Sequence, residues 1–537
     1  GSTFSVVGEV SMSHAARTVY NALDIKSTYS ATRGSTIRGF RTGSDYEWRL
    51  GDVGALAGNT TRGLGLSSRT DIQLMPGASS AVMIVDSESR VSISNRDAGT
   101  KNTIFGRYAG ANGSIGDYNA FFGDTVANDT LTTDASNNVG VGYRAMHALT
   151  AGSENTSIGA ESGYNMGVGV RNTAVGRYAL NKGAAEKTVA IGYEAGRYAT
   201  GSFNTFVGTQ AGVGGTTSAP FSSGQNNTAI GYRALDAFTT GPGNTAVGVN
   251  SLTAVTTGDY NVGLGYNTGG GLTSGALNVA IGYTALQADS QGSGTVAIGQ
   301  QAGLLQNFGA VTTYNTLVGA NAGNKNLNTG IHFTAIGANA GHYATGSYNT
   351  FLGSSAGRGG VTSAPYSSGT YNTAIGYRAL NSFTTAVNNT ILGVDAGYSI
   401  TTGPHSVMIG YGAGDDITTG GWNVIIGGGG TRNYGADFGN NIAIGYDALS
   451  AGNANFYRAI AIGRGAANKN TTNDNMAIGY EAMKVHTTGT RNIAIGNYAM
   501  DDTDAGSTSL GSNDNIFIGY DAGGGTWADS ANINNVA

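Results

Sequence analysis

The feature that most constrains this chain is a short repeat that runs through most of its length. The nonapeptide Asn-Thr-Ala-Ile-Gly-Tyr-Arg-Ala-Leu occurs identically at 227–235 and 372–380, and 24 copies, most of them degenerate, are centred on glycines from Gly106 to Gly519. Most of these anchor glycines are 16 to 18 residues apart. Solenoid units that contain a helix need roughly 20 to 47 residues. The repeat therefore predicts a β-solenoid in which each copy forms one coil.

The alternation around each anchor glycine indicates how a coil is built. In Thr228-Ala229-Ile230, β-branched residues lie on one face of a predicted strand and alanine on the other. We expect a second short strand over the Tyr-Arg-Ala that follows, and turns over the Thr-Thr-Gly segments. Successive coils should pair as parallel strands about 4.8 Å apart. The predicted fold is all-β, a parallel β-roll or β-helix solenoid of about 24 coils over residues 101–537.

Two residue types recur at fixed offsets from the anchor glycine. Asn lies four residues before it in 19 of 24 copies, and Ala lies three residues after it in 19 of 24. A side-chain amide repeated at one coil position can bond to the same amide in the next coil. We interpret the asparagines as a structural ladder with members such as Asn155, Asn204, Asn244, Asn278, Asn349, Asn441 and Asn492.

The apolar content of one coil is small, with one or two Ile or Val and several Ala and Gly. A long single chain of such coils would bury too little apolar surface to be stable alone. Three chains packed through their alanine faces would supply the missing burial and protect exposed edges. The sequence thus predicts a parallel homotrimer.

One form of the repeat carries a family resemblance. The segment Asn-Ile-Ala-Ile-Gly-Tyr-Asp-Ala at 441–448 resembles the head repeat of trimeric autotransporter adhesins, and similar repeats occur in phage tail fibres. The resemblance covers about residues 101–537. It implies a left-handed parallel β-roll in a tight trimer, located outside the cell as part of a virion tail fibre or, alternatively, on a bacterial surface.

Residues 1–100 lack the glycine series and are richer in charged residues. The alternating segment at 46–50 predicts a strand. The segments at 72–76, 81–86 and 90–93 resemble the strand-rich region that precedes the repeats of phage fibres. We expect a small N-terminal β domain that either attaches the chain to a fibre base or caps the first coil.

The composition argues against several kinds of partner and cofactor. The net charge is -5, and no basic run could neutralise a nucleic acid backbone. The chain has no Cys, which excludes disulfides, zinc-thiolate sites and cysteine nucleophiles. No apolar stretch approaches the roughly 20 residues that span a bilayer. We expect no nucleic acid, no membrane insertion, no metal and no cofactor.

Insertions in a solenoid form loops on one face, and three steps between anchor glycines lengthen to 23 residues. Two insertions are near copies, at 217–223 and 362–368, and contain Phe221 and Tyr366. An exposed aromatic ring offers a flat apolar face to a sugar. Phe221 and Tyr366 are therefore candidate ligand-binding residues, with packing on neighbouring coils as the alternative.

Other candidates lie near the C-terminal end of the chain. Trp422 and Trp527 are candidate ligand anchors if they are exposed and core residues if they are not. Tyrosines that follow many anchor glycines predict a stripe along the coils. The third insertion contains acidic residues that could either bind a hard cation or form solvated surface, namely Asp501, Asp502, Asp504 and Asp514.

These observations predict an extended trimeric fibre for adhesion, most simply a phage tail fibre that recognises a host surface glycan. A bacterial trimeric adhesin and a structural shaft that joins a base to a tip protein remain alternatives. A polysaccharide depolymerase is disfavoured, since glycoside cleavage needs two nearby carboxyl groups. Glutamates are sparse in the repeat region, occurring at 154, 161, 186, 194 and 481.

Overall fold

The computed structural model describes the backbone of six strands within residues 1–100 and most of the chain beyond them. In residues 101–537 it describes all but 111–114, 184, 216–220, 327–328, 363–365, 429–436, 451–454, 456, 502–511 and 525–535. The chain divides into two compact units, Gly1–Arg96 and Asp97–Ala537. Every regular element in the described parts is a β-strand.

The first unit contains two antiparallel sheets of three strands. One sheet pairs β1 and β3 with β2 between them, and the other pairs β4 and β6 with β5. The second sheet lies within the segments at 72–93 that resemble a strand-rich lead-in. The strands are β1 (Thr36–Phe40), β2 (Glu47–Asp52), β3 (Leu64–Ser68), β4 (Ile72–Leu74), β5 (Met83–Val85) and β6 (Val91–Ile93).

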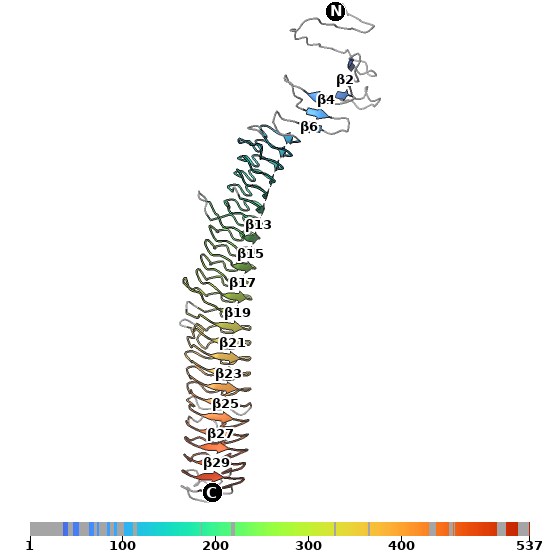
Figure 1. The fold of residues 1–537 in the computed structure, drawn as a ribbon. Helices are drawn as coiled ribbons and strands as arrows, with labels where there is room; N and C mark the ends of the chain where they lie inside the picture. Colours follow the sequence, from blue (N-terminus) through green and yellow to red (C-terminus); the bar gives the residue numbers. More distant parts are fainter. Residues whose placement is uncertain are drawn as a thin grey trace, which may run out of the picture. The chain divides into compact units, whose positions relative to one another are not determined.

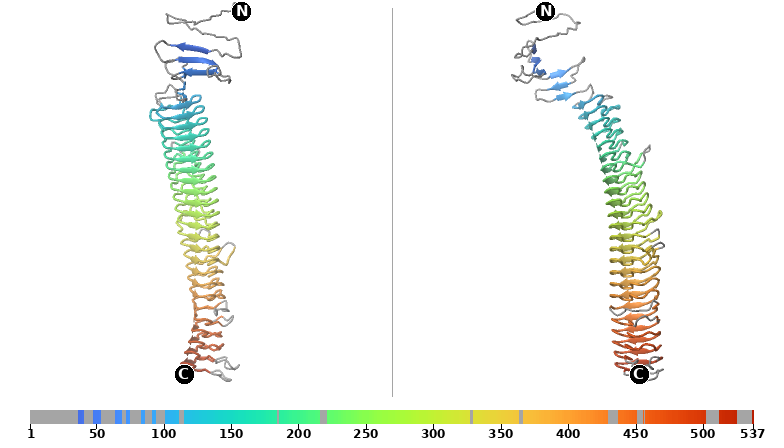
Figure 2. Two further views of the ribbon diagram at one scale, coloured as in Figure 1. Left: turned by 90° about the vertical axis from the view of Figure 1, so that its right-hand side faces the viewer. Right: turned by 180° about the vertical axis from the view of Figure 1, so that it is seen from behind.

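The second unit is a stack of coils, each of which contributes one strand of three residues just before its anchor glycine (Figures 1 and 2). The strands are β7 (Thr103–Phe105), β8 (Ala120–Phe122), β9 (Val139–Val141), β10 (Thr156–Ile158), β11 (Thr173–Val175), β12 (Val189–Ile191), β13 (Thr205–Val207), β14 (Thr228–Ile230), β15 (Thr245–Val247), β16 (Val262–Leu264), β17 (Val279–Ile281), β18 (Val296–Ile298), β19 (Thr316–Val318), β20 (Thr334–Ile336), β21 (Thr350–Leu352), β22 (Thr373–Ile375), β23 (Thr390–Leu392), β24 (Val407–Ile409), β25 (Val424–Ile426), β26 (Ile442–Ile444), β27 (Ile460–Ile462), β28 (Met476–Ile478), β29 (Ile493–Ile495) and β30 (Ile516–Ile518).

Strands of consecutive coils pair in parallel, with equivalent residues opposite one another. Between β14 and β15, for example, Ala229 lies opposite Ala246. The pairing follows chain order from β7 with β8 to β29 with β30. At about 4.8 Å per strand, 24 strands extend over about 110 Å. The prediction of an all-β parallel solenoid is confirmed.

The second strand that we expected after each anchor glycine is absent, and in the described coils that segment is a turn. In the coil of residues 231–247, Arg233 and Leu235 have φ angles of 52° and 51°. Left-handed residues at alternate positions prevent an extended strand. The turn still bonds to both neighbouring coils, because Arg233 N–H donates to Thr209 O (3.1 Å) and Leu235 N–H donates to Ser251 O (2.9 Å).

The anchor positions require glycine because the backbones of successive coils touch there. Gly231 has a φ of 127°, and a Cβ atom on it would lie 2.6 Å from the carbonyl oxygen of Gly248. Neither the dihedral angle nor the space admits a side chain. The stacked glycines therefore set the close approach of one coil to the next.

The core lies inside the coils and runs along the whole stack. The middle residue of each strand points inward, as does the alanine after the anchor glycine, and both Ala229 and Ala234 are fully buried. Some large middle residues pack on another ring, as Phe206 does on Phe238 at 5.6 Å between centroids. The expectation that alanine faces are free to pack against other chains is therefore wrong, because these faces form the interior of a single chain.

The asparagines four residues before the anchor glycines bond from coil to coil. Asn155 donates from Nδ2 to Asn138 Oδ1 (3.1 Å) and to Gly169 O (2.8 Å), and its Oδ1 accepts the N–H of Asn172 (2.9 Å). Each amide thus pairs a turn carbonyl and a backbone N–H that the coil interior would otherwise leave without a partner. The buried members include Asn155, Asn204, Asn244, Asn278, Asn349, Asn441 and Asn492.

Candidate functional site

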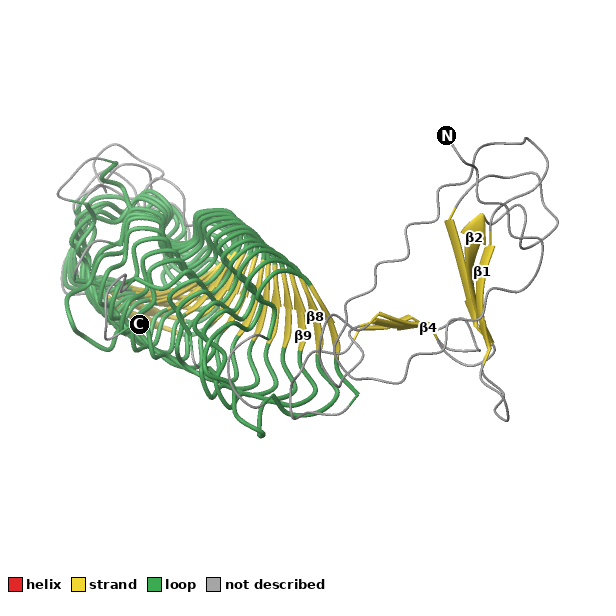
Figure 3. Ribbon diagram, turned by 90° about the horizontal axis from the view of Figure 1, so that it is seen from above, coloured by secondary structure: helices red, strands yellow, loops and turns green. Residues whose placement is uncertain are grey.

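The first and third residues of strands β7 to β30 form what we call the outer face, which lies on one side of the coils (Figure 3). The third residue is Phe, Val, Ile or Leu in all 24 strands. Several of these side chains are exposed, including Ile158 at 41% and Leu392 at 43%. The first residue is often Thr in the middle of the stack and Ile in β26, β27, β29 and β30. The outer face is thus a continuous apolar strip that becomes more apolar toward the C-terminus.

A second surface lies two residues before each strand, where one residue per coil forms what we call the corner column. All 24 of its residues have a left-handed backbone, with φ between 50° and 74°. The members are Lys101, Tyr118, Asn137, Glu154, Arg171, Lys187, Phe203, Asn226, Gly243, Tyr260, Leu277, Gly294, Tyr314, His332, Tyr348, Tyr371, Asn388, His405, Trp422, Asn440, Arg458, Asp474, Arg491 and Asp514.

Four successive members of the corner column form a stack of aromatic rings. The centroids are 5.4 Å apart from Tyr314 to His332, 5.1 Å from His332 to Tyr348, and 4.9 Å from Tyr348 to Tyr371. All four side chains are exposed. Asn and Gly adopt a left-handed backbone at least cost, whereas other residues lose about 1–2 kcal/mol there. Stacking at about 0.5–1.5 kcal/mol per pair offsets part of that cost. The stack therefore forms an aromatic surface at positions where the left-handed backbone would favour Asn or Gly.

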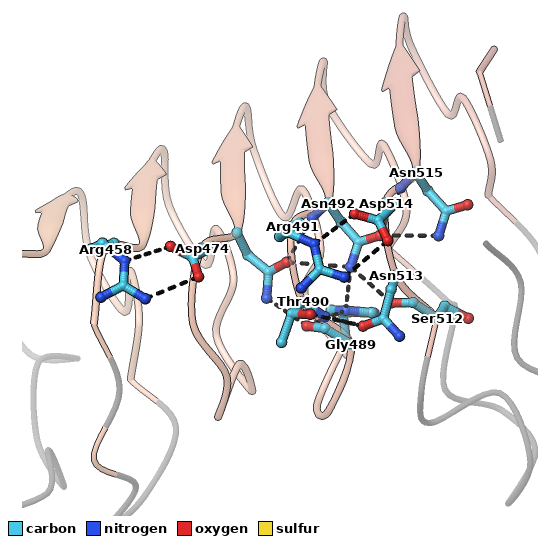
Figure 4. A network of polar contacts seen from close by, with 12 residues as sticks. Arg458, Asp474, Gly489, Thr490, Arg491, Asn492, Ser512, Asn513, Asp514 and Asn515 are labelled. Carbon is cyan, nitrogen blue, oxygen red and sulfur yellow. Dashed lines mark hydrogen bonds and ion pairs between the residues drawn. The ribbon is translucent and has the colours of Figure 1, made fainter. Parts of the chain in front are cut away.

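The C-terminal part of the corner column carries alternating charges (Figure 4). Arg458 Nε lies 2.6 Å from Asp474 Oδ1, and Arg491 Nε lies 2.6 Å from Asp514 Oδ1. The hydrogen bond from Arg491 holds the pKa of Asp514 below its usual range. Ion pairs this exposed add little stability. Opposite charges at one coil position do, however, oppose a shift of coil register, because a shift of one residue would place each arginine opposite an uncharged asparagine.

The acidic residues of the third insertion do not form a cation site in the described part of the chain. Asp514 is paired with Arg491, Asp501 is described at the start of the insertion, and Asp502 and Asp504 lie outside the described residues. No group of three or more His, Cys, Asp or Glu side chains that could hold a metal ion occurs among the residues that the structure describes.

The predicted aromatic ligand residues occupy different coils and do not converge on one site. Phe221 is half-buried beside Tyr198 at 6.2 Å, and Tyr366 is half-buried beside Tyr343 at 6.0 Å. These two positions are equivalent, as their near-identical loops predict. Trp527 lies outside the described residues.

Trp422 is 58% exposed and stacks on His405 at 4.1 Å between centroids. It belongs to the corner column, which we did not identify from the sequence. The column could have been found from the sequence, because the residue five positions before the anchor glycine is aromatic in four successive copies of the repeat.

The predicted tyrosine stripe one residue after the anchor glycines lies at the surface. Tyr232 and Tyr377 are both exposed, and Tyr266 stacks on Tyr283 at 5.4 Å. The stripe is interrupted by other residue types, so it offers pairs of rings and not one continuous surface.

None of the described elements is a helix long and apolar enough to cross a membrane. A scan against protein-family models, a search of curated proteins and a search of solved structures each find no match to this chain.

Proposed function

We propose that this chain is an extended adhesive fibre, which assembles as a parallel homotrimer through its outer face and displays its exposed columns to a glycan on a host surface. Among adhesive fibres we favour a virion tail fibre, because the repeat resembles those of phage tail fibres. The observation that carries the proposal is the outer face, where all 24 strands present an apolar third residue.

The apolar strip favours association with another copy of this chain. Monomeric soluble proteins rarely expose contiguous apolar patches larger than a few hundred Å². A partner that covers every strand must repeat at the same rise per coil, and a second copy in parallel register does so. The change from Thr in the middle strands to Ile in β26 and β27 further favours parallel packing, because the most apolar ends then meet.

The width of the outer face favours three chains. Each strand has three residues, so the strip is narrow and long. Three narrow faces close around a threefold axis and leave the remaining sides of each chain in contact with water. A trimer also multiplies weak contacts with a surface ligand.

The proposal is tested by the mass of the full chain in solution. We expect about 163 kDa by light scattering, three times the 54.2 kDa of one chain. The double variant Ile375→Lys/Leu392→Lys places two charges on the outer face and should shift the mass to that of one chain. A parent protein of 54.2 kDa at micromolar concentration would refute the assembly.

The matched control is Thr385→Lys/Thr402→Lys. These two exposed residues are also 17 positions apart in neighbouring coils, but they lie outside the strands. The control should remain trimeric. Adhesion is then measured as binding of the parent and both double variants to whole host cells and to the extracted surface polysaccharide. Failure of the trimeric parent to bind either would refute the adhesive function.

A further inference from the structure

The corner column contains two glycines, Gly243 and Gly294, and their surroundings differ. A Cβ atom on Gly243 would lie 2.6 Å and 2.7 Å from ring atoms of Tyr260, so the next ring in the column leans over that position. A Cβ atom on Gly294 would lie 3.8 Å from the nearest ring atom of Tyr314. The position beside Gly294 is therefore not covered by the neighbouring ring.

The residues around Gly294 are unusually exposed and apolar. Its column neighbours, Leu277 and Tyr314, are 64% and 63% exposed. The backbone of Val311, itself an exposed residue, is held beside this position because its carbonyl accepts the N–H of Ser293 (3.1 Å). Three exposed apolar residues, Leu277, Val311 and Tyr314, thus surround a residue that has no side chain.

The spacing of the coils gives this position room for one ring. Leu277 and Tyr314 are two coil steps apart, which is about 9.6 Å. A flat ring between them needs contacts of about 3.5–4.0 Å on each side. A ring placed over Gly294 would therefore continue the aromatic stack by one position.

We propose that the position over Gly294 binds one pyranose ring of a carbohydrate chain, stacked between Tyr314 and Leu277. The assignment rests on the proposed adhesive function and names the place and chemistry of recognition. The C–H face of a sugar is apolar and packs on an aromatic ring, while its hydroxyls face outward. Thr312 is an exposed residue whose Cγ2 lies 3.3 Å from the Cβ position of Gly294, so we expect its hydroxyl to bond to the sugar edge.

The stack preorganises the proposed site. Tyr314 is held on its other face by His332, which stacks on Tyr348 and through it on Tyr371. A ring that is already fixed loses little conformational freedom when a ligand binds. A stable protein interface needs about 800 Å² per partner, which is the contribution of roughly 20–30 residues, whereas the position over Gly294 is bordered by three exposed apolar residues. The geometry therefore favours a sugar over a protein partner.

The test is saturation-transfer NMR on the full chain with a panel of methyl pyranosides of glucose, galactose, mannose and N-acetylglucosamine. We expect transfer to at least one of them at millimolar concentration. Gly294→Tyr fills the position with a ring that the column accommodates elsewhere, and Tyr314→Ala removes the platform. Each should reduce the transfer at least tenfold.

The matched control is Asn388→Tyr, which adds the same side chain at the other end of the aromatic stack and should leave the transfer unchanged. Equal transfer in Gly294→Tyr and the parent would overturn the assignment, as would the absence of transfer to any of the four sugars. N-acetyl-tryptophanamide is included as a competitor. If it binds at Gly294 more tightly than every sugar, the site recognises aromatic side chains and the proposal is wrong.

The outcome is separable from that of the proposed function. Light scattering of Gly294→Tyr checks that its assembly equals that of the parent. If the parent binds host cells and Gly294→Tyr binds them equally well, the adhesive function stands and this site is refuted. If the sugar binds at Gly294 but the chain is monomeric, the site stands and the proposed assembly is refuted.

Discussion

At the scale of single residues, this protein depends on polar groups that are buried and paired. Each ladder asparagine forms hydrogen bonds with polar groups of neighbouring coils, so the loss of one amide leaves groups in those coils without a partner. Asn372 donates to Asn349 Oδ1 (3.1 Å) and to Ala386 O (2.8 Å), and its Oδ1 accepts the N–H of Asn389 (3.1 Å). Removing it would leave buried donors and acceptors without a partner.

We predict that Asn372→Ala destabilises its coil by about 2–4 kcal/mol, since each buried group left unpaired costs about 1–3 kcal/mol. Hydrogen exchange should show the loss locally, because contacts in a solenoid extend only to neighbouring coils. The control Asn388→Gly changes an exposed residue with a left-handed φ of 58°, and should leave exchange near the parent rate. Similar exchange in both variants would show that the ladder adds no stability.

Asp289 is a second buried polar residue, and it makes stability depend on pH. Burial raises the pKa of its carboxyl, although hydrogen bonds from Gly292 N–H, Gln306 Nε2 and Phe308 N–H oppose the rise. The folded chain therefore holds this proton more tightly than the unfolded chain, whose aspartate has a pKa of about 3.9. Its contribution to stability is full below that value and is lost as pH rises through the folded pKa.

We accordingly predict that Asp289→Asn gains stability relative to the parent as pH rises from about 4, and that the difference levels off above the folded pKa. The amide Nδ2 would face Gln306 Nε2, which adds a constant cost at all pH values. Melting temperatures of both proteins between pH 4 and 8 measure the difference. A difference that is independent of pH would contradict the raised pKa.

At the scale of the coil, the anchor glycine decides whether one element can stack on the next. Gly231 combines a φ of 127° with direct contact between backbones. Gly167 also has a positive φ, 53°, but no atom lies within 4 Å of its Cβ position. The two glycines therefore separate the effect of the dihedral angle from the effect of space.

We predict that Gly167→Ala costs about 1–2 kcal/mol, the usual cost of a left-handed residue. Gly231→Ala should cost more than about 3 kcal/mol, because strain of the dihedral angle and a clash with Gly248 O act together. Hydrogen exchange of strands β13 to β15 measures the second effect. Equal costs for the two variants would show that the backbones can move apart at the anchor position.

At the scale of the whole molecule, the proposed assembly links stability to concentration. A chain that is stable only when its outer face is covered melts at a temperature that rises with protein concentration. We predict such a rise for the parent and for Thr385→Lys/Thr402→Lys. Ile375→Lys/Leu392→Lys should melt at a lower temperature that does not change with concentration. A parent melting temperature that is independent of dilution would contradict an obligate assembly.

Much of the solenoid could be predicted because its interactions repeat at the period of the sequence. The positions of β7 to β30 could be predicted from the anchor glycines, because the residues before the glycine have a strand-like alternation in the repeat. The asparagine offset located a buried column for the same reason. The second strand could not be excluded from the sequence, because Arg233 and Leu235 are not residue types that signal a left-handed backbone.

The sequence by itself determined the period, the parallel pairing and the residues that share a column, because each follows from the spacing of the copies. Only the tertiary structure decided which face of each strand points inward. Alanine and isoleucine are both apolar, so alternation alone does not distinguish the two faces. A coil of about 17 residues encloses little volume, and Ala229 fits inside whereas Ile230 stays outside. The same packing turns the corner column outward and leaves the position over Gly294 uncovered by the ring of Tyr314.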